Sequence, residues 1–584
     1  MSITAPLRIA VYRNLWLAVL VSNIGLWMQT VGAQWLLVSE PNASTLVALV
    51  QTASLLPVFL LALPSGALAD SLDRRRLLLA VQTGLAVVGG LLTLFTAIGD
   101  LHPALLLTFT FALGAGQALT LPAWQALIPD LVPRPQLVSA SALGSISINV
   151  ARAVGPAVAG LLIAQAGAAV VFGINALTFV LFAAVLARWR PATSSAPRTP
   201  EPFTAAVRAG SRYVRHSPVV RRILLRAVLF IAPGNALWAL LPLVASKRLG
   251  FGSGGYGLML TVLGAGAVAG AFLLGPIRAR VSNNRMLFVA GVLYAAALAV
   301  LGLVQVPALV MIALLPAGLA WVAVLSTINA SMQLFLPGWV RARGLSIYQI
   351  VISGAQALPA LAWGLLADAA GLPVALAASA ALMLAGTLSL RFWGLIDTGN
   401  MDRQPVVFWP EPHLTLEPDP RTGPVLVTAR YRVRPENEAA FIDAMQGVRR
   451  SVQRTGAYRW GLFRDGVQGG TFVAVYLVAS WEEHLRQHEG RFTGSDQAAE
   501  ERARALADGP PEVSHLLPAT RPQPPADAPE PAEPGSVVPE AATRESVVPE
   551  TVAPGEPVAG QGTVPAEIVE PNPAAAGRPG HVAG

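Results

Sequence analysis

Residues 45–98 read TLVALVQTASLLPVFLLALPSGALADSLDRRRLLLAVQTGLAVVGGLLTLFTAI, two long apolar runs joined by one short charged turn. The runs cover residues 45–69 and 77–98, and each has the roughly 20 mostly apolar residues that an α-helix needs to cross a bilayer. Between them lie two aspartates and three consecutive arginines. The stretch therefore predicts a membrane hairpin whose charged turn faces water on one side.

The same pattern recurs along the first two thirds of the chain. Of the 584 residues, 54% are apolar and only 13% are charged, whereas soluble domains are about 25% charged. The composition therefore favours an all-α membrane protein, and the absence of cysteine excludes disulfides and thiolate metal sites. We predict twelve transmembrane helices, near residues 15–38, 45–69, 77–98, 103–125, 139–165, 168–188, 222–245, 255–276, 286–304, 308–335, 345–369 and 373–396.

The basic residues are unevenly distributed among the turns. Residues 1–396 hold 24 Lys and Arg against seven Asp and Glu. If the N-terminus is cytoplasmic, 21 of these basic residues lie in cytoplasmic segments, and only Lys247 and Arg248 lie outside. Cytoplasmic loops of membrane proteins carry this excess of positive charge. We predict a multi-pass protein of the bacterial inner membrane with both termini cytoplasmic, and we attribute its basic charge to topology, with no nucleic-acid partner.

A polar stretch at residues 189–221 divides the spans into two groups of six. Within it, residues 203–214 have the pattern of an amphipathic helix lying at the membrane surface. The motif LPAW at 121–124 has a counterpart, LPGW at 336–339, at the same place in the second group. Internal repeats of this kind are common in transporters, whose substrate path lies between the halves. The predicted domains so far are 1–188, the linker 189–221, and 222–396.

The charged turn after the second span carries a motif of its own, GALADSLDRRR at residues 66–76. It resembles the G-x-x-x-D-x-x-x-R-R loop of the major facilitator superfamily, although Ser71 and Asp73 depart from the usual pattern. The resemblance covers residues 1–396 and implies alternating access, in which two six-helix bundles rock about a central cavity. It also implies a cytoplasmic gate against the start of the eleventh span, formed by Gly66, Asp70, Asp73, Arg74, Arg75, Arg341 and Arg343.

Three further stretches resemble the branch of that superfamily that includes the enterobactin exporter. They are RNLWLAVLVSNIGLWMQT at 13–30, LPAWQALIPDLVP at 121–133 and NVARAVGP at 149–156. Gly155, Pro156 and Gly160 in addition resemble an exporter-type G-P-x-x-x-G motif, with Ala159 where that family normally has glycine. The resemblance implies proton-coupled export of a small organic molecule, such as a siderophore or a drug-like compound. An importer of the same fold is the alternative.

Arg152 is the most polar side chain deep in a predicted span. A charge in mid-membrane costs several kcal/mol unless it faces a wet cavity or a partner. We expect it to attract anions in the central cavity, the alternative being a hydrogen bond to helix carbonyls or to Asn149. Asn23, Trp27 and Gln34 in the first span are the next candidates for substrate contact, although polar residues in spans also join helices to one another.

Proton coupling has weak support from the residues themselves. Glu40 and Asp368 lie near the outer ends of their spans, and no acid lies mid-span. No Walker-type phosphate-binding motif is present, which argues against an ATP-driven pump. Coupling to protons therefore rests on the resemblance.

The composition changes after the last span. Strand and helix patterns alternate as βαββαβ, which predicts a cytoplasmic ferredoxin-like α+β domain at residues 405–517. The pattern resembles the small dimeric domains of the antibiotic-biosynthesis-monooxygenase type, and we expect a dimerisation or regulatory module. The alternative function for the chain is a membrane-anchored sensor or enzyme that acts through this domain.

His484 and His488 have the helical spacing of metal ligands. No third ligand is evident from the sequence, so we expect no metal and no cofactor. Residues 518–584 are rich in Pro, Ala and Glu and lack the apolar residues of a core. We expect this tail to be disordered.

Overall fold

A computed structural model of the chain describes residues 4–189, 203–278, 280–399, 401–402, 404, 406, 418–488 and 491–519. Within these residues, twelve helices are long and apolar enough to cross a membrane, which confirms the predicted number. They are α1 (Ala10–Leu36), α2 (Ala43–Ser71), α3 (Arg74–Ile98), α4 (Pro103–Leu131), α5 (Leu137–Ala166), α6 (Ala168–Arg188), α8 (Pro218–Leu243, continued by a π turn to Arg248), α9 (Ser253–Arg278), α10 (Asn283–Leu303), α11 (Pro307–Phe335), α12 (Gly338–Ala370) and α13 (Leu372–Leu388, followed by the short α14, Leu390–Trp393).

Local sequence sets where the hairpin of α2 and α3 turns. Asp73 is the N-cap of α3, and its side chain accepts a hydrogen bond from the backbone N–H of Arg76 at 2.7 Å. Such caps satisfy N–H groups that the first helical turn leaves without partners. At the other end of α3, Gly99 has φ 77°, the left-handed conformation that glycine adopts readily. The predicted span therefore has a fixed start and a fixed stop.

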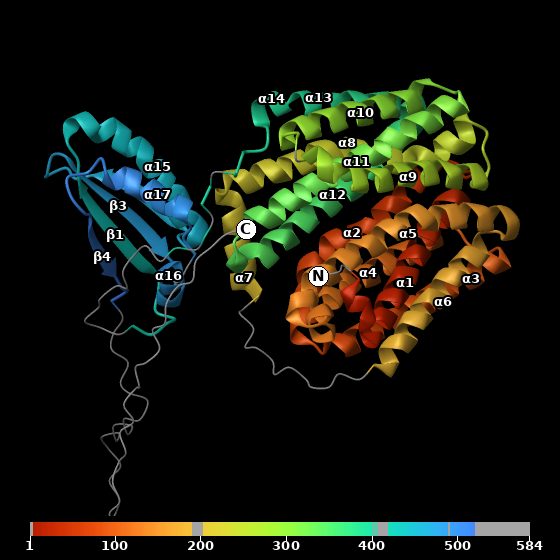
Figure 1. Cartoon of the computed structure of the whole chain (residues 1–584), viewed down its shortest axis with the longest axis horizontal. Helices are drawn as coiled ribbons and strands as arrows, with labels where there is room; N and C mark the ends of the chain where they lie inside the picture. Colours follow the sequence, from red (N-terminus) through yellow and green to blue (C-terminus); the bar gives the residue numbers. More distant parts are fainter. Residues whose placement is uncertain are drawn as a thin grey trace, which may run out of the picture. The chain divides into compact units, whose positions relative to one another are not determined.

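The spans form two groups, α1–α6 and α8–α13, which Figure 1 shows in red to orange and in yellow to green. The groups meet along two helix pairs, α2 against α12 and α5 against α9. Consecutive helices alternate in direction, so their turns gather at two ends of the bundle. We call the end with the α2–α3, α4–α5 and α9–α10 turns the Arg-rich end, and the end with the α1–α2, α3–α4 and α10–α11 turns the far end.

Close backbone approach at the far end joins the two groups. A Cβ on Gly364 of α12 would lie 2.5 Å from the Cβ of Ala48 in α2 and 2.7 Å from the carbonyl oxygen of Ser44. Thr52 of α2 also donates a hydrogen bond to the carbonyl oxygen of Ala357 in α12 at 2.8 Å. Small residues permit this approach, because helices in membranes associate by packing and by hydrogen bonds.

The predicted amphipathic helix is α7 (Phe203–His216). It packs against α12, where the ring of Tyr213 lies edge-on to Trp339 with centroids 5.7 Å apart. A Cβ on Gly210 would lie 2.9 Å from the Cβ of Arg343, so the two helices are in close contact. The N-terminal part of the predicted linker, residues 190–202, lies outside the described residues.

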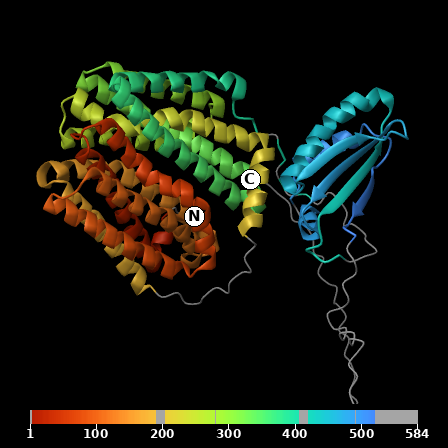
Figure 2. The same cartoon turned by 180° about the vertical axis from the view of Figure 1, so that it is seen from behind.

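A four-stranded antiparallel sheet follows the spans among the described residues. Its strands are β1 (Val425–Arg432), β2 (Arg459–Arg464), β3 (Thr471–Val478) and β4 (Glu512–Leu516), in the order β2-β3-β1-β4. The helices are α15 (Glu438–Thr455), α16 (Trp481–His488) and α17 (Gly494–Arg504). This order and the βαββαβ succession confirm the ferredoxin-like topology. Figure 2 shows the sheet of this region in teal to blue, with helices lying along it.

The sheet and helices enclose apolar side chains that alternate along the strands. Val425 and Val427 of β1, spaced two apart, are buried with Val452 of α15 and Trp481 of α16. The period of two places them on one face of the sheet. Residues 520–584, which hold most of the predicted disordered tail, lie outside the described residues.

Candidate functional site

Arg152 lies in the middle of α5, beside α1. Its guanidinium carbon is 5.6 Å from the ring centroid of Trp27, a cation–π distance. Among the described residues, its buried Nε has no hydrogen-bond partner. Asn149 donates through Nδ2 to the carbonyl oxygen of Ser145 at 2.9 Å, and no hydrogen bond joins Arg152 to Asn149 among the described residues. The guanidinium thus retains donor capacity for an anionic group.

Gly155 makes the approach of Trp27 to α5 possible. A Cβ at this position would lie 2.7 Å from the Cβ of Trp27 and 3.1 Å from the carbonyl oxygen of Ile24. Pro156 follows it as a buried residue inside α5. One turn nearer the Arg-rich end, Asn23 donates to the hydroxyl of Ser147 at 3.1 Å, which ties α1 to α5 again. Gly155 of the exporter-type motif therefore lets the first span lie close to the arginine.

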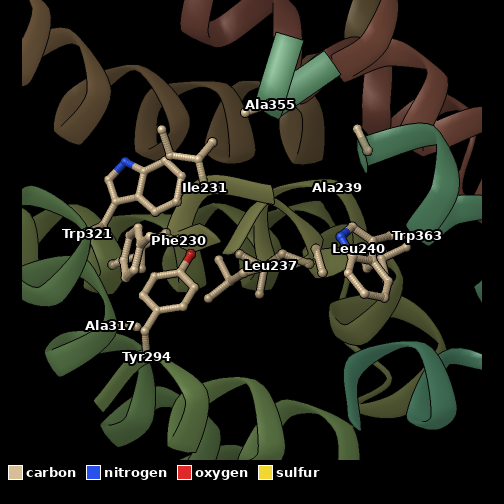
Figure 3. Packing of buried hydrophobic residues seen from close by; sticks show 14 of the residues in the cluster. Phe230, Ile231, Leu237, Ala239, Leu240, Tyr294, Ala317, Trp321, Ala355 and Trp363 are labelled. Atoms are coloured by element: carbon tan, nitrogen blue, oxygen red, sulfur yellow. The ribbon is translucent and has the colours of Figure 1, made fainter. Parts of the chain in front are cut away.

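Trp27 also contacts the second group of helices. Its ring centroid lies 5.8 Å from that of Trp238 in α8. From there, aromatic rings continue inward, with Trp238 5.7 Å from Trp321 and Trp321 5.7 Å from Tyr294. Figure 3 shows Trp321, Tyr294 and Phe230 gathered against one another in this cluster. Trp27 thus contacts Arg152 of its own half and Trp238 of the other half.

Gln34 forms a polar bridge between the halves, two turns from Trp27 along α1. Its Oε1 accepts a hydrogen bond from the hydroxyl of Tyr256 in α9 at 2.7 Å. Its Nε2 lies 3.4 Å from the carbonyl oxygen of Trp238, to which it donates. Both atoms of the amide are therefore used within the protein. In this conformation Gln34 joins the helices and does not offer its amide to a ligand.

Asp368 joins the halves at the far end. It lies near the end of α12, and its carboxylate accepts hydrogen bonds from the backbone N–H groups of Thr45 at 2.8 Å and Ser44 at 3.2 Å. These groups belong to the first turn of α2, where the helix dipole also favours negative charge. An acid of one half therefore caps a helix of the other.

The charged turn at the Arg-rich end makes contacts within the first half. Arg74 donates to Asp130 and to the carbonyl oxygen of Ala126 in α4, both at 3.0 Å. Arg75 donates to the carbonyl oxygens of Leu186 and Ala187, the end of α6, at 3.1 and 2.8 Å. The turn thus holds the ends of α4 and α6 together.

The remaining residues of the predicted gate are only partly described. The surroundings of Gly66 and the side chain of Asp70 lie outside what the structure describes, so the predicted pairing of Asp70 with Arg74 stays a prediction. Arg341 donates to the carbonyl oxygen of Leu336 at 3.2 Å, within its own helix start. Arg343 lies two residues further along α12, facing α7 at Gly210.

Two residues that join the halves were not predicted from the sequence. Trp238 and Tyr256 belong to the second half, whereas the predicted substrate residues all lie in the first. The internal repeat offered a signal, because the first span of the second half is the counterpart of α1 and carries its own tryptophan. The contacts of these residues with Trp27 and Gln34, however, can be seen only in the three-dimensional arrangement of the helices.

The comparisons with known proteins agree with this arrangement. The pattern of the transmembrane secretion effector family matches residues 1–523. The chain belongs to this family, a family of major facilitator transporters. Membership confirms the prediction of a multi-pass transporter over that of a membrane-anchored enzyme.

Curated relatives of this transporter are named for siderophores. It is 25% identical over 285 residues to the staphyloferrin A transporter of Staphylococcus aureus, a match that covers 47% of this chain and 69% of that protein. It is 26% identical over 271 residues to an enterobactin exporter of Shigella boydii, covering 46% of this chain and 63% of that protein. The matches thus span roughly two thirds of these relatives.

Solved transporters share the fold at low identity. A bacterial homologue of the lysosomal transporter Spinster, in an inward-facing and unoccupied conformation, aligns with a TM-score of 0.51 at 18% identity, over 67% of this chain and 96% of its own. The nucleoside transporter NupG aligns with a TM-score of 0.55 at 11% identity, over 66% of this chain and 99% of its own. These alignments show the twelve-helix fold alone.

Proposed function

We propose that this protein is a secondary active exporter of a small anionic organic molecule, of the siderophore class, in the bacterial inner membrane. The observation that carries the proposal is the contact of Arg152 with Trp27 at the meeting of the two halves. Siderophores bind ferric iron through oxygen donors, and those built on carboxylates are negatively charged at neutral pH in the iron-free molecule. A guanidinium offers several donors to such oxygens, and the neighbouring indoles offer apolar area.

The names of the curated relatives support this substrate class independently. One is named as a transporter of staphyloferrin A and others as exporters of enterobactin. The exporter-type residues Gly155, Pro156 and Gly160 favour export over import. Gly155 positions Trp27 beside Arg152, so the motif and the proposed anion site form one structure.

The direction of transport depends on orientation. The excess of arginine at the turns that we call the Arg-rich end favours a cytoplasmic location for that end. The contacts described between the halves at Gly364, Thr52 and Asp368 lie toward the far end. Closure at the far end is required of a state that is open to the cytoplasm, the state in which an exporter accepts its substrate.

For coupling, we propose that protons act at Asp368. Its carboxylate, in the second half, accepts hydrogen bonds from backbone N–H groups of the first half. It lies at the end of the bundle that we assign to the outside. Protonation removes the negative charge that caps α2 and weakens the closure of the far end. A proton entering from outside thereby favours the outward-open state, from which substrate leaves.

Reconstituted proteoliposomes test the function. We would impose pH gradients of both polarities and follow a labelled iron-free carboxylate siderophore. A cationic dye serves as the comparison substrate. Accumulation of the siderophore that depends on the polarity of the gradient, and that a protonophore abolishes, is the expected result. Preference for the cationic dye would contradict the anionic substrate class, and transport unaffected by the protonophore would contradict proton coupling.

A further inference from the structure

The ferredoxin-like region contains a cluster of three histidines that the transport function does not use. His484 and His488 lie one turn apart on α16, and His515 lies on β4. One imidazole nitrogen of each lies within 4.8 Å of the others. The third residue is separated by 27 positions from the second in the sequence, which is why the helical pair alone indicated no site.

Strand pairing brings His515 to the helical pair. In the antiparallel register, His515 of β4 is opposite Val427 of β1. Val427 is buried on the face of the sheet that carries Trp481, the first residue of α16. The ring centroids of His484 and His515 are therefore only 4.8 Å apart, and those of His484 and His488 are 4.7 Å apart.

The hydrogen-bond network prepares one nitrogen of His484 as a metal ligand. Gln487 donates through Nε2 to the carbonyl oxygen of Val452 and to the hydroxyl of Thr455, which leaves its Oε1 as an acceptor. Oε1 lies 3.3 Å from Nδ1 of His484. The proton of a neutral His484 is thus assigned to Nδ1, and the lone pair is on Nε2. Histidine ligands of metals are commonly oriented by such a bond at their other nitrogen.

The distances suit a small divalent ion. Nε2 of His484 lies 3.2 Å from Nε2 of His488. Two nitrogens that bind Zn²⁺ at about 2.0–2.1 Å in tetrahedral geometry are about 3.3 Å apart. The third nitrogen, from His515, lies within 4.8 Å of the others and needs to move inward by roughly 1.5 Å. His515 is half-buried on the edge strand β4, so its side chain has room to turn.

The protonation states also favour a ligand role. Burial, followed by the neighbouring His488 and His515, lowers the pKa of His484 to about 3. Burial and His488 likewise lower the pKa of His515. Neutral imidazole is the form that binds metals. The shifts at His484 and His515 are therefore in the direction that metal binding requires.

We propose that His484, His488 and His515 bind one divalent transition-metal ion, of the borderline class that includes Zn²⁺ and Co²⁺, with a coordination position left for water. Imidazole ligands suit this class, and three histidines with one open position are a known arrangement for zinc. The site is independent of the proposed transport function.

The site adjoins a contact between the ferredoxin-like region and the helices α7 and α12. Glu483, the residue before His484, accepts hydrogen bonds from Arg212 of α7 at 2.6 Å and from Arg491 at 2.8 Å. The guanidinium of Arg491 lies 4.7 Å from the ring centroid of Trp339 at the start of α12. The proposed metal ligand His484 is thus next in sequence to Glu483, which connects this region to α7 and, through Arg491, to α12. Helix α12 is one of the helices that join the two halves of the transporter.

Equilibrium binding to the full-length chain tests the proposal. We would strip purified protein in detergent with a chelator, titrate Zn²⁺ by calorimetry, and record the visible spectrum with Co²⁺. One ion per chain and the intense bands of four-coordinate Co²⁺ are expected. His515→Asn and His488→Asn should each weaken binding by at least about tenfold, while His216→Asn, a histidine of α7 outside the cluster, leaves it unchanged.

Folding of each variant is checked by circular dichroism, and His515→Asn is the safer variant because the residue is only half-buried. Absence of stoichiometric binding to folded wild-type protein would overturn the proposal. Binding that persists unchanged in folded His515→Asn and His488→Asn would overturn it too, because the ion would then be held by other residues.

Discussion

Gly160 of α5 and Gly257 of α9 meet backbone to backbone between the two halves of the transporter. A Cβ on Gly160 would lie 2.8 Å from the Cα of Gly257, and a Cβ on Gly257 would lie 2.9 Å from the Cα of Gly160. No side chain fits between them, so this helix crossing closes the far end only when both residues are glycine. The same glycine ends the exporter-type motif, which gives that motif a physical role in closure.

Gly160→Ala is therefore expected to destabilise the state closed at the far end. Forcing an extra methyl group into a packed contact costs about 1–3 kcal/mol, which shifts a two-state equilibrium by about 5- to 150-fold. The chain has no cysteine, so spin labels at Asp100→Cys and Val306→Cys report only the far end. The distance distribution between the labels should lengthen in Gly160→Ala.

The matched control for this experiment is Gly144→Ala in the same helix, where a Cβ meets nothing within 4 Å. It should leave the distance distribution as in wild type. Equal distributions in all three proteins would show that the glycine contact does not limit closure.

Asp368→Asn is expected to uncouple transport from the proton gradient. The neutral amide keeps the shape of the carboxylate but loses the charge at the start of α2, where charge-assisted hydrogen bonds contribute about 1.5–3 kcal/mol each. Exchange of substrate across the membrane without a gradient should continue, whereas gradient-driven accumulation should be lost. Glu40→Gln changes an acid in the turn between α1 and α2, at the same end of the bundle. It is the control and should retain both exchange and gradient-driven accumulation. Retained gradient dependence in Asp368→Asn would assign coupling elsewhere.

Glu483→Ala should destabilise the ferredoxin-like region and its contact with α7. The side chains of Arg212 and Arg491 are only 10% and 7% exposed, and Glu483 pairs with both. Burial alone raises the pKa of Glu483, but hydrogen bonds and charge from Arg491 and Arg212 outweigh it and lower the pKa. Removing the carboxylate takes away the shared partner of two buried arginines, which should lower the free energy of unfolding by about 3–5 kcal/mol.

Thermal unfolding of the purified chain, followed by circular dichroism, measures this effect. The neighbouring Glu482 pairs with Arg486 but is 51% exposed, so Glu482→Ala should change stability by no more than about 1 kcal/mol. A similar small change in both variants would show that the contact with Arg212 is not formed in the isolated protein.

The fold was largely predictable from the sequence because long apolar runs and alternating strand patterns are strong signals. Twelve long apolar runs have few competing structures in a membrane, where backbone groups must be satisfied within a helix. The predicted span 77–98 ends where α3 does but begins three residues late, because Asp73 caps the helix and starts it at Arg74. In the ferredoxin-like region, the predicted βαββαβ succession was recognisable because alternation and flanking turns define strands such as β3.

The contacts between distant elements were not predictable in the same way. Trp238 and Tyr256 lie more than 200 residues from the side chains of α1 that they contact. His515, the third histidine of the proposed metal site, comes from a strand whose register decides which face it occupies. The role expected for Gln34 as a substrate residue is also weakened, because its amide is fully engaged with Tyr256 and Trp238. Such contacts depend on helix placement and strand register, which no local pattern encodes.

The most direct test of the central claim is gradient-driven accumulation of a labelled iron-free siderophore in everted membrane vesicles carrying wild type, Arg152→Lys or Arg152→Ala. Loss of one charge-assisted interaction with an anion corresponds to about 1.5–3 kcal/mol. We therefore expect Arg152→Ala to lower transport by at least about tenfold, with Arg152→Lys intermediate because it keeps the charge and loses the fork geometry. Equal accumulation by Arg152→Ala and wild type, at equal amounts of folded protein, would contradict an anion site at Arg152 and with it the proposed substrate class.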